Sequence, residues 1–111
     1  MRRAQAAPTV PVIDLRGDIN GFAEESLNAA YAEAEAANPS AIVLNFSGVE
    51  YLNSTGIALI VGLLARARKN GRRVLTCGLS DHYAEIFQIT RLADFMTIVQ
   101  DEASALAVVT R

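Results

Sequence analysis

This chain of 111 residues holds few of the residue types from which catalytic and metal sites are usually built. Its single cysteine, Cys77, excludes an internal disulfide, and together with its single histidine, His82, it cannot supply a conventional set of zinc ligands. A Ser-His-Asp triad would have to rest on His82 alone. These absences predict a protein that is not an enzyme and that holds no metal and no cofactor.

Neither sign of charge dominates, and long apolar runs are missing. Ten Lys and Arg stand against twelve Asp and Glu, whereas domains that bind nucleic acid electrostatically usually carry a clear basic excess. The longest apolar run, at residues 57–65, is about half the length of a membrane span. Residues 1–8 lack the apolar stretch of a signal peptide. We therefore expect a cytoplasmic domain with no nucleic-acid partner and no membrane insertion.

What the chain does contain is an alternation of strand-like and helix-like segments. Strands are predicted at residues 9–15, 41–46, 73–78 and 95–99, and helices at residues 22–37, 54–69, 80–87 and 101–109. Loops are expected at residues 17–21 and 47–53. This order implies an α/β fold with a mainly parallel sheet of four to five strands and about four helices. We expect one domain over residues 9–111 after an N-terminal extension over residues 1–8.

Finer features of the strands and helices also lead to predictions. Pro11 favours an edge strand or a strand start, because proline has no N–H to donate to a neighbouring strand. The first helix is expected to bury Leu27, Tyr31 and Ala34. The second helix is expected to bury a 3-4 spaced set consisting of Ile57, Ile60, Val61, Leu64 and Ala67.

Ser54 stands at the start of the second predicted helix, and two roles are open for it. Its Oγ can cap the helix by accepting a hydrogen bond from the N–H of Gly56 or Ile57. Alternatively, Ser54 is a phosphoacceptor, because unpaired N–H groups and the positive end of the helix dipole favour a phosphate there. Nucleophilic catalysis is disfavoured, since the segment lacks the glycine two residues before the serine that a nucleophile elbow requires.

The segments around Ser54 resemble the signature of the STAS domain family, in particular its stand-alone bacterial anti-sigma factor antagonists. The signature is carried by VLNFSGV at residues 43–49 and YLNSTGI at residues 51–57. Weaker similarity is found in GDIN at residues 17–20, in residues 70–80, and in IF and ITRL between residues 86 and 92. The resemblance extends over about residues 12–106 and implies a STAS-like fold.

The resemblance also implies a partner switch. Such a protein, when unphosphorylated, binds an anti-sigma factor with serine kinase activity and so frees a sigma factor. The kinase then uses ATP to phosphorylate the antagonist, and a serine phosphatase restores it. Position by position, Ser54 is the implied phosphoacceptor, with Thr55 less favoured. The implied partner-binding residues are Asp18, Ile19, Asn20, Asn53, Thr55, Gly56 and Ile57.

Two departures from the family pattern affect these expectations. The family usually has aspartate where this chain has Asn53, and often where it has Asn20, so the loop around the acceptor is less acidic here. Such proteins also commonly begin with two strands, whereas only about one fits before Gly17. Either the sheet lacks one strand or residues 2–8 form an irregular extension.

Several alternatives stay open beside this interpretation. The domain could be a STAS scaffold or interaction subunit of a larger signalling or lipid-transport complex that is not phosphorylated. The five basic residues between positions 66 and 73 could bind an acidic partner, although the negative end of the helix dipole already favours cations there. Cys77 is expected to be buried, and His82 to lie on the surface. Ile19, Phe22, Tyr51 and Leu52 could form an interface patch or fold onto the core.

Overall fold

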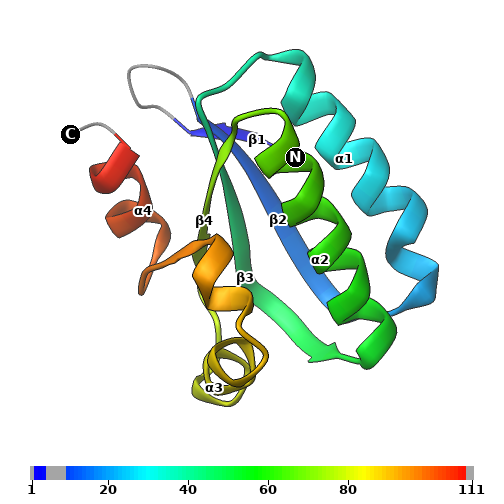
Figure 1. Cartoon of the computed structure of the whole chain (residues 1–111). Coiled ribbons are helices and arrows are strands. Elements are labelled where there is room, and N and C mark those ends of the chain that lie inside the picture. Colours follow the sequence, from blue (N-terminus) through cyan, green and yellow to red (C-terminus); the bar gives the residue numbers. More distant parts are fainter. Residues whose placement is uncertain (1, 5–9, 110–111) are drawn as a thin grey trace.

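The computed structural model describes residues 2–4 and 10–109, and this part of the chain forms one five-stranded sheet (Figure 1). The strands are β1 (Arg2–Ala4), β2 (Val10–Ile19), β3 (Ala41–Leu52), β4 (Arg73–Cys77) and β5 (Thr97–Ile98). They follow one another across the sheet in chain order. β1 pairs antiparallel with β2, and the other neighbouring strands pair in parallel. The predicted α/β class and mainly parallel sheet are confirmed.

Helices cover the two faces of the sheet unequally. The helices are α1 (Glu24–Ala36), α2 (Ser54–Lys69), α3 (Asp81–Ile89) and α4 (Glu102–Val109), with short 3-10 helices η1 (Gly21–Ala23) and η2 (Leu92–Phe95). Residues of α1, α2, α3 and η2 share one apolar cluster with one face of the strands. α4 lies on the opposite face, as Figure 1 shows, and packs there on Val43, Leu75 and Cys77. The buried Cys77 confirms the prediction made for it.

Of the two predictions made from Pro11, the edge strand is wrong, because β2 lies between β1 and β3, and the strand start is confirmed, because β2 begins at Val10. β1 lies outside β2 and pairs Arg3 with Pro11, so the sheet is not one strand short. Pro11 is tolerated because pairing between β2 and β3 begins only at Val12, which leaves proline without a ladder partner on that side. The predicted extension over residues 1–8 therefore contributes a strand at residues 2–4, and its other residues lie outside the described part of the chain.

Two segments predicted as loops are continuations of strands. β2 runs on to Ile19 and β3 to Leu52, and they stay paired up to Ile19 and Leu52. The register between them shifts twice, after Asp14 and after Gly17, and Gly17 has the left-handed φ of +66°. The polar and glycine residues that predicted a turn therefore lie at bulge-like irregularities between two paired strands. Gly17 adopts a left-handed backbone conformation there that other residues rarely adopt.

Smaller differences concern the helices and the last strand. The first helix starts at Glu24 after η1. Of the strand predicted at residues 95–99, only the two residues of β5 form a strand, and Phe95 belongs to η2. In α2 the expected core residue Val61 is 45% exposed, and Leu63 is buried instead. Leu27, Tyr31 and Ala34 are buried as predicted, and the helix predicted from residue 80 has Ser80 as its N-cap.

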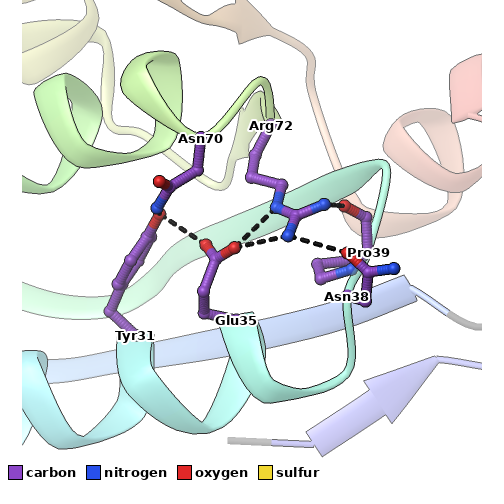
Figure 2. Close-up of polar contacts among 6 residues, drawn as sticks. All are labelled: Tyr31, Glu35, Asn38, Pro39, Asn70 and Arg72. Carbon is purple, nitrogen blue, oxygen red and sulfur yellow. Dashed lines mark hydrogen bonds and ion pairs between the residues drawn. The ribbon is translucent and has the colours of Figure 1, made fainter.

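A polar cluster joins the end of α1 to the turn between α2 and β4 (Figure 2). The Arg72 Nε donates to Glu35 Oε1 at 2.7 Å, and its Nη1 donates to the Pro39 carbonyl oxygen at 2.7 Å. The Tyr31 hydroxyl donates to Glu35 Oε2 at 2.7 Å, and Asn70 Nδ2 donates to the Tyr31 hydroxyl at 3.4 Å. Arg72, one of the five basic residues between positions 66 and 73, therefore has a structural role inside the domain.

Candidate functional site

The start of α2 lies where β3 ends, at the carboxyl end of the parallel strands. Asn53 is the N-cap: its Oδ1 accepts a hydrogen bond of 2.7 Å from the N–H of Gly56, and its carbonyl oxygen accepts one of 2.9 Å from Ile57. The prediction that the Ser54 hydroxyl caps the helix is therefore wrong. An amide oxygen caps this position as well as a hydroxyl does, and the helix begins one residue earlier than a Ser54 cap would require.

Ser54 is the first residue of α2, and its side chain is exposed. Within residues 2–4 and 10–109, no hydrogen bond of the Ser54 hydroxyl is found, because the cap is already supplied by Asn53. The first turn of α2 holds no acidic residue, and its apolar interior side is separate from this exposed end. The site thus presents a hydroxyl at the positive end of a helix of 16 residues.

The end of β2 is locked against the start of α2. The Asn53 N–H donates to the Ile19 carbonyl oxygen at 3.3 Å. Gly56 is buried against the same carbonyl, and a Cβ at position 56 would overlap the Ile19 oxygen. Glycine is therefore required here for close approach of two backbones rather than for flexibility.

This contact brings together the two segments that contain the predicted partner-binding residues. Asp18 pairs with Tyr51, and Ile19 pairs with Leu52, immediately before Asn53. Asp18 and Thr55 are exposed, Asn20, Asn53 and Ile57 are half-buried, and Ile19 and Gly56 are buried. We define the Ser54 face as the surface formed by Asp18, Asn20, Asn53, Ser54 and Thr55.

Asn20 has the same role on its segment as Asn53 has on α2. Its Oδ1 accepts a hydrogen bond of 2.9 Å from the N–H of Phe22, and its carbonyl oxygen accepts one of 2.9 Å from Ala23. Both departures from aspartate in the chain therefore fall on capping positions, where an amide oxygen accepts the same backbone hydrogen bonds without a negative charge.

The four apolar residues near the site divide between core and surface. Ile19 and Leu52 are buried, whereas Phe22 is 96% exposed and Tyr51 is 57% exposed. The Leu52 N–H donates to the Tyr83 hydroxyl of α3 at 2.9 Å. Sequence reasoning missed this support, because Tyr83 is 31 residues away and stands in an ordinary helical pattern.

The Ser54 face offers little that could perform chemistry by itself. In the part of the chain that the structure describes, no group of three His, Cys, Asp or Glu side chains could hold a metal ion. His82 is exposed and stacks edge-on against Tyr83, with 5.0 Å between the ring centroids. Of the described helices, none is long and apolar enough to cross a membrane. What the arrangement can do is accept a group on Ser54 and present a surface to another molecule.

Comparison with known proteins gives a family and related sequences. The family model described as STAS domain matches residues 2–105. An anti-sigma-B factor antagonist of Staphylococcus aureus is 37% identical over 57 residues, which make up 51% of this chain and 53% of that protein. The chain thus matches about half the length of such curated relatives.

Solved structures share the fold with low sequence identity. A sulfate transporter family protein from Wolinella succinogenes has a TM-score of 0.78 and 18% identity, and the match covers 89% of this chain and 83% of that one. The Bacillus anti-sigma factor antagonist SpoIIAA, in its unphosphorylated form, has a TM-score of 0.73 and 20% identity, with 97% and 96% covered. At these identities the likeness shows the fold alone.

Proposed function

Because the chain belongs to the STAS domain family, we propose that it is an anti-sigma factor antagonist controlled by phosphorylation of Ser54. In this role it binds an anti-sigma factor with serine kinase activity in the bacterial cytoplasm. Phosphorylation by that kinase releases the partner, and a serine phosphatase reverses the change. The proposal draws on the Staphylococcus aureus relative, which is named an anti-sigma-B factor antagonist, and on SpoIIAA, which has been solved in a phosphorylated form.

The observation that carries the proposal is that Asn53, and not Ser54, supplies the N-cap of α2. Asn53 caps α2, so the exposed Ser54 hydroxyl is left free to be modified without loss of the cap. Because the Asn53 cap does not involve the Ser54 hydroxyl, a phosphate on Ser54 would leave this capping hydrogen bond in place and would change the exposed surface.

The electrostatic effect of a phosphate on Ser54 is large and local. It adds nearly two negative charges at a helix N-terminus, where free N–H groups and the helix dipole stabilise an anion. The chain carries a formal net charge of −2, so one phosphate about doubles it in a single place. A partner that binds the neutral Ser54 face would then meet a strongly anionic one.

The other members of the predicted set support this face in different ways. Asp18 and Thr55 are exposed and can contact a partner directly. Asn20 and Asn53 fix the two backbone turns, and Ile19 and Gly56 hold them together from below. Ile57, half-buried in the first turn of α2, borders the face.

Capture from the source bacterium followed by a kinase assay tests the proposal. Wild-type protein and Ser54→Ala are expected to retain a nucleotide-binding partner that Ser54→Asp loses. With ATP, the captured partner is expected to add one phosphate to wild-type protein and to Thr55→Val, and none to Ser54→Ala, as measured by intact-protein mass spectrometry.

Two results would contradict the assignment. Phosphate that persists in Ser54→Ala but disappears in Thr55→Val would move the acceptor to Thr55. A partner captured equally by wild-type protein and Ser54→Asp would instead favour a scaffold role, in which STAS domains bind partners without a phosphate switch.

A further inference from the structure

We propose that this domain associates head to tail with second copies of itself, Phe22 of one copy entering an apolar groove beside α2 of the next. The groove and the Phe22 segment carry opposite charges at their rims, and each is unpartnered within the described part of one chain. The inference does not depend on phosphorylation and stands apart from the proposed function.

The groove lies between α2 and η2. It has a volume of about 200 Å³ and is lined by Val61, Leu64, Ala65, Arg68, Leu92 and Phe95. Val61 of α2 and Phe95 of η2 both line the groove and are 45% and 52% exposed, so the groove presents apolar surface to the solvent. The Arg68 guanidinium lies 5.4 Å from the centre of the Phe95 ring and forms a charged rim.

The basic rim continues beyond the groove. An adjacent hollow of about 420 Å³ shares Leu64, Arg68 and Phe95 with it and adds the exposed Arg73, together with Arg72, whose charge is already paired with Glu35. Its one lining carboxylate, Asp94, already forms an ion pair of 2.7 Å with Arg91. The groove therefore suits a segment in which an apolar side chain is flanked by acidic ones.

The chain itself carries such a segment on another part of its surface. Phe22 is 96% exposed, and Glu24 and Glu25 in the first turn of α1 are exposed beside it. The three side chains line one shallow surface hollow together with Gly21 and Asn28. The Asn20 cap holds the Phe22 N–H at 2.9 Å, so the ring is presented from an ordered 3-10 turn rather than from a loose loop.

The placement of the two surfaces decides the kind of assembly. Phe22 stands next to the start of α2, where Gly21 faces Thr55, whereas the groove lies along α2 beyond Val61 on the side of η2. Since knob and groove are different patches, the contact is heterologous and each copy can engage two others. A contact formed mainly by one side chain in a small groove is weak, so association is expected only at high protein concentration.

Sedimentation equilibrium of the full chain, at concentrations up to about 1 mM, tests this inference in a range that detects weak complexes. The average mass of the wild-type protein is expected to rise above the monomer value of 11.9 kDa as concentration increases. Phe22→Ser, which removes the knob, and Val61→Glu, which blocks the groove, are each expected to abolish the rise. Ile89→Ser is the matched control, because Ile89 is 72% exposed but lies outside both surfaces.

An equal mixture of Phe22→Ser and Val61→Glu provides the decisive measurement. The first variant keeps an intact groove and the second an intact Phe22, so the mixture is expected to regain association and to stop at a heterodimer. Circular dichroism of each variant checks that it is folded. A wild-type protein that stays monomeric, single variants that associate like the wild type, or a mixture that stays monomeric would each overturn the inference.

Discussion

Asn53 and Ser54 are neighbours in the chain with different tasks at the start of α2. The Asn53 side chain satisfies the N–H of Gly56 inside the fold, while the Ser54 side chain points to the exposed end of the helix. The amide oxygen makes the capping hydrogen bond without a negative charge. The Asn53 side chain therefore stabilises the helix, and the Ser54 side chain is the proposed phosphoacceptor. Substituting one residue at a time can test the two roles independently.

Replacing the cap should cost stability, whereas replacing the acceptor should not. Asn53→Ala is expected to lower the free energy of unfolding by about 1 kcal/mol, because the Gly56 N–H loses its acceptor. Ser54→Ala is expected to change it by less than about 0.5 kcal/mol, as for other exposed sites. Urea unfolding followed by circular dichroism measures both changes.

Asn53→Asp serves as the control for this pair. The carboxylate accepts the same hydrogen bond and adds a favourable interaction with the helix dipole, so stability should equal or exceed that of the wild type. Equal losses in Asn53→Ala and Ser54→Ala would show that both side chains cap α2, and would contradict the separation of roles described above.

At the scale of the element, α2 contains two glycines with opposite structural meanings. A Cβ at Gly56 would overlap the Ile19 carbonyl oxygen, whereas a Cβ at Gly62 would meet no atom within 4 Å. Gly56→Ala is therefore expected to lower the free energy of unfolding by about 2 kcal/mol through the displacement of α2 from β2. Gly62→Ala is expected to raise it by up to about 1 kcal/mol, because alanine favours the helix.

Thermal or urea unfolding of the two alanine variants gives the comparison directly. The same chemical change in the same helix controls for the intrinsic helix preference of alanine. A Gly56→Ala variant as stable as Gly62→Ala would mean that β2 and α2 can separate at no cost, and the close contact beneath the Ser54 face would lose its significance.

The polar cluster between α1 and the α2–β4 turn should make stability depend on pH in the acid range (Figure 2). The hydrogen bond from Arg72 lowers the pKa of Glu35 from its usual value of 4.5, and the Tyr31 hydroxyl and the charge of Arg72 act in the same direction. A lowered pKa in the folded state stabilises the fold above pH 4.5, and this stabilisation is lost as pH falls through the folded-state pKa.

Comparison with Glu35→Gln tests this dependence. The variant is expected to be less stable than the wild type by about 1 kcal/mol at pH 7, a charged hydrogen bond reduced for partial exposure. The difference should shrink below pH 4.5, because the wild type loses the same charge by protonation. Urea midpoints measured from pH 7 to pH 3 would contradict the assignment if the two proteins stayed parallel.

The elements that the sequence predicted well are those whose ends and interior agree. α2 has a regular apolar spacing, a cationic last turn and Gly71 with a φ of +73° after it, so its extent follows from local chemistry. The extensions of β2 and β3 could not be predicted, because their polar residues are held by pairing with each other rather than by local preference. The Asn53 cap was missed because asparagine and serine are equally suited to that position.

One part of the candidate site could be predicted because it follows from local sequence. Residues 53–57 are consecutive, so their position on a helix start follows from the sequence. That the Asp18–Asn20 segment lies beside them came only from the family resemblance, and the structure supplies the physical cause in the Ile19 carbonyl. The sequence left the position of Phe22 open between a surface patch and the core, and the structure shows that it is exposed.

At the scale of the whole molecule, the sheet is covered by several helices on one face and by α4 on the other (Figure 1). The described part of α4 is eight residues long and buries Ala105 against Val43, Leu75 and Cys77. A short helix that packs on a sheet face without neighbouring helices is expected to open more readily than the rest of the domain.

The position of Cys77 turns this asymmetry into a kinetic reporter. The thiol is 1% exposed beneath α4, so a thiol-specific reagent should modify it only when α4 has moved away. Ala105→Asp is expected to speed labelling at least tenfold relative to the wild type, because it places a charge in that contact. If Cys77 in Ser54→Asp is labelled at the wild-type rate, a negative charge at the start of α2 does not affect the opening of α4 on the other face of the sheet.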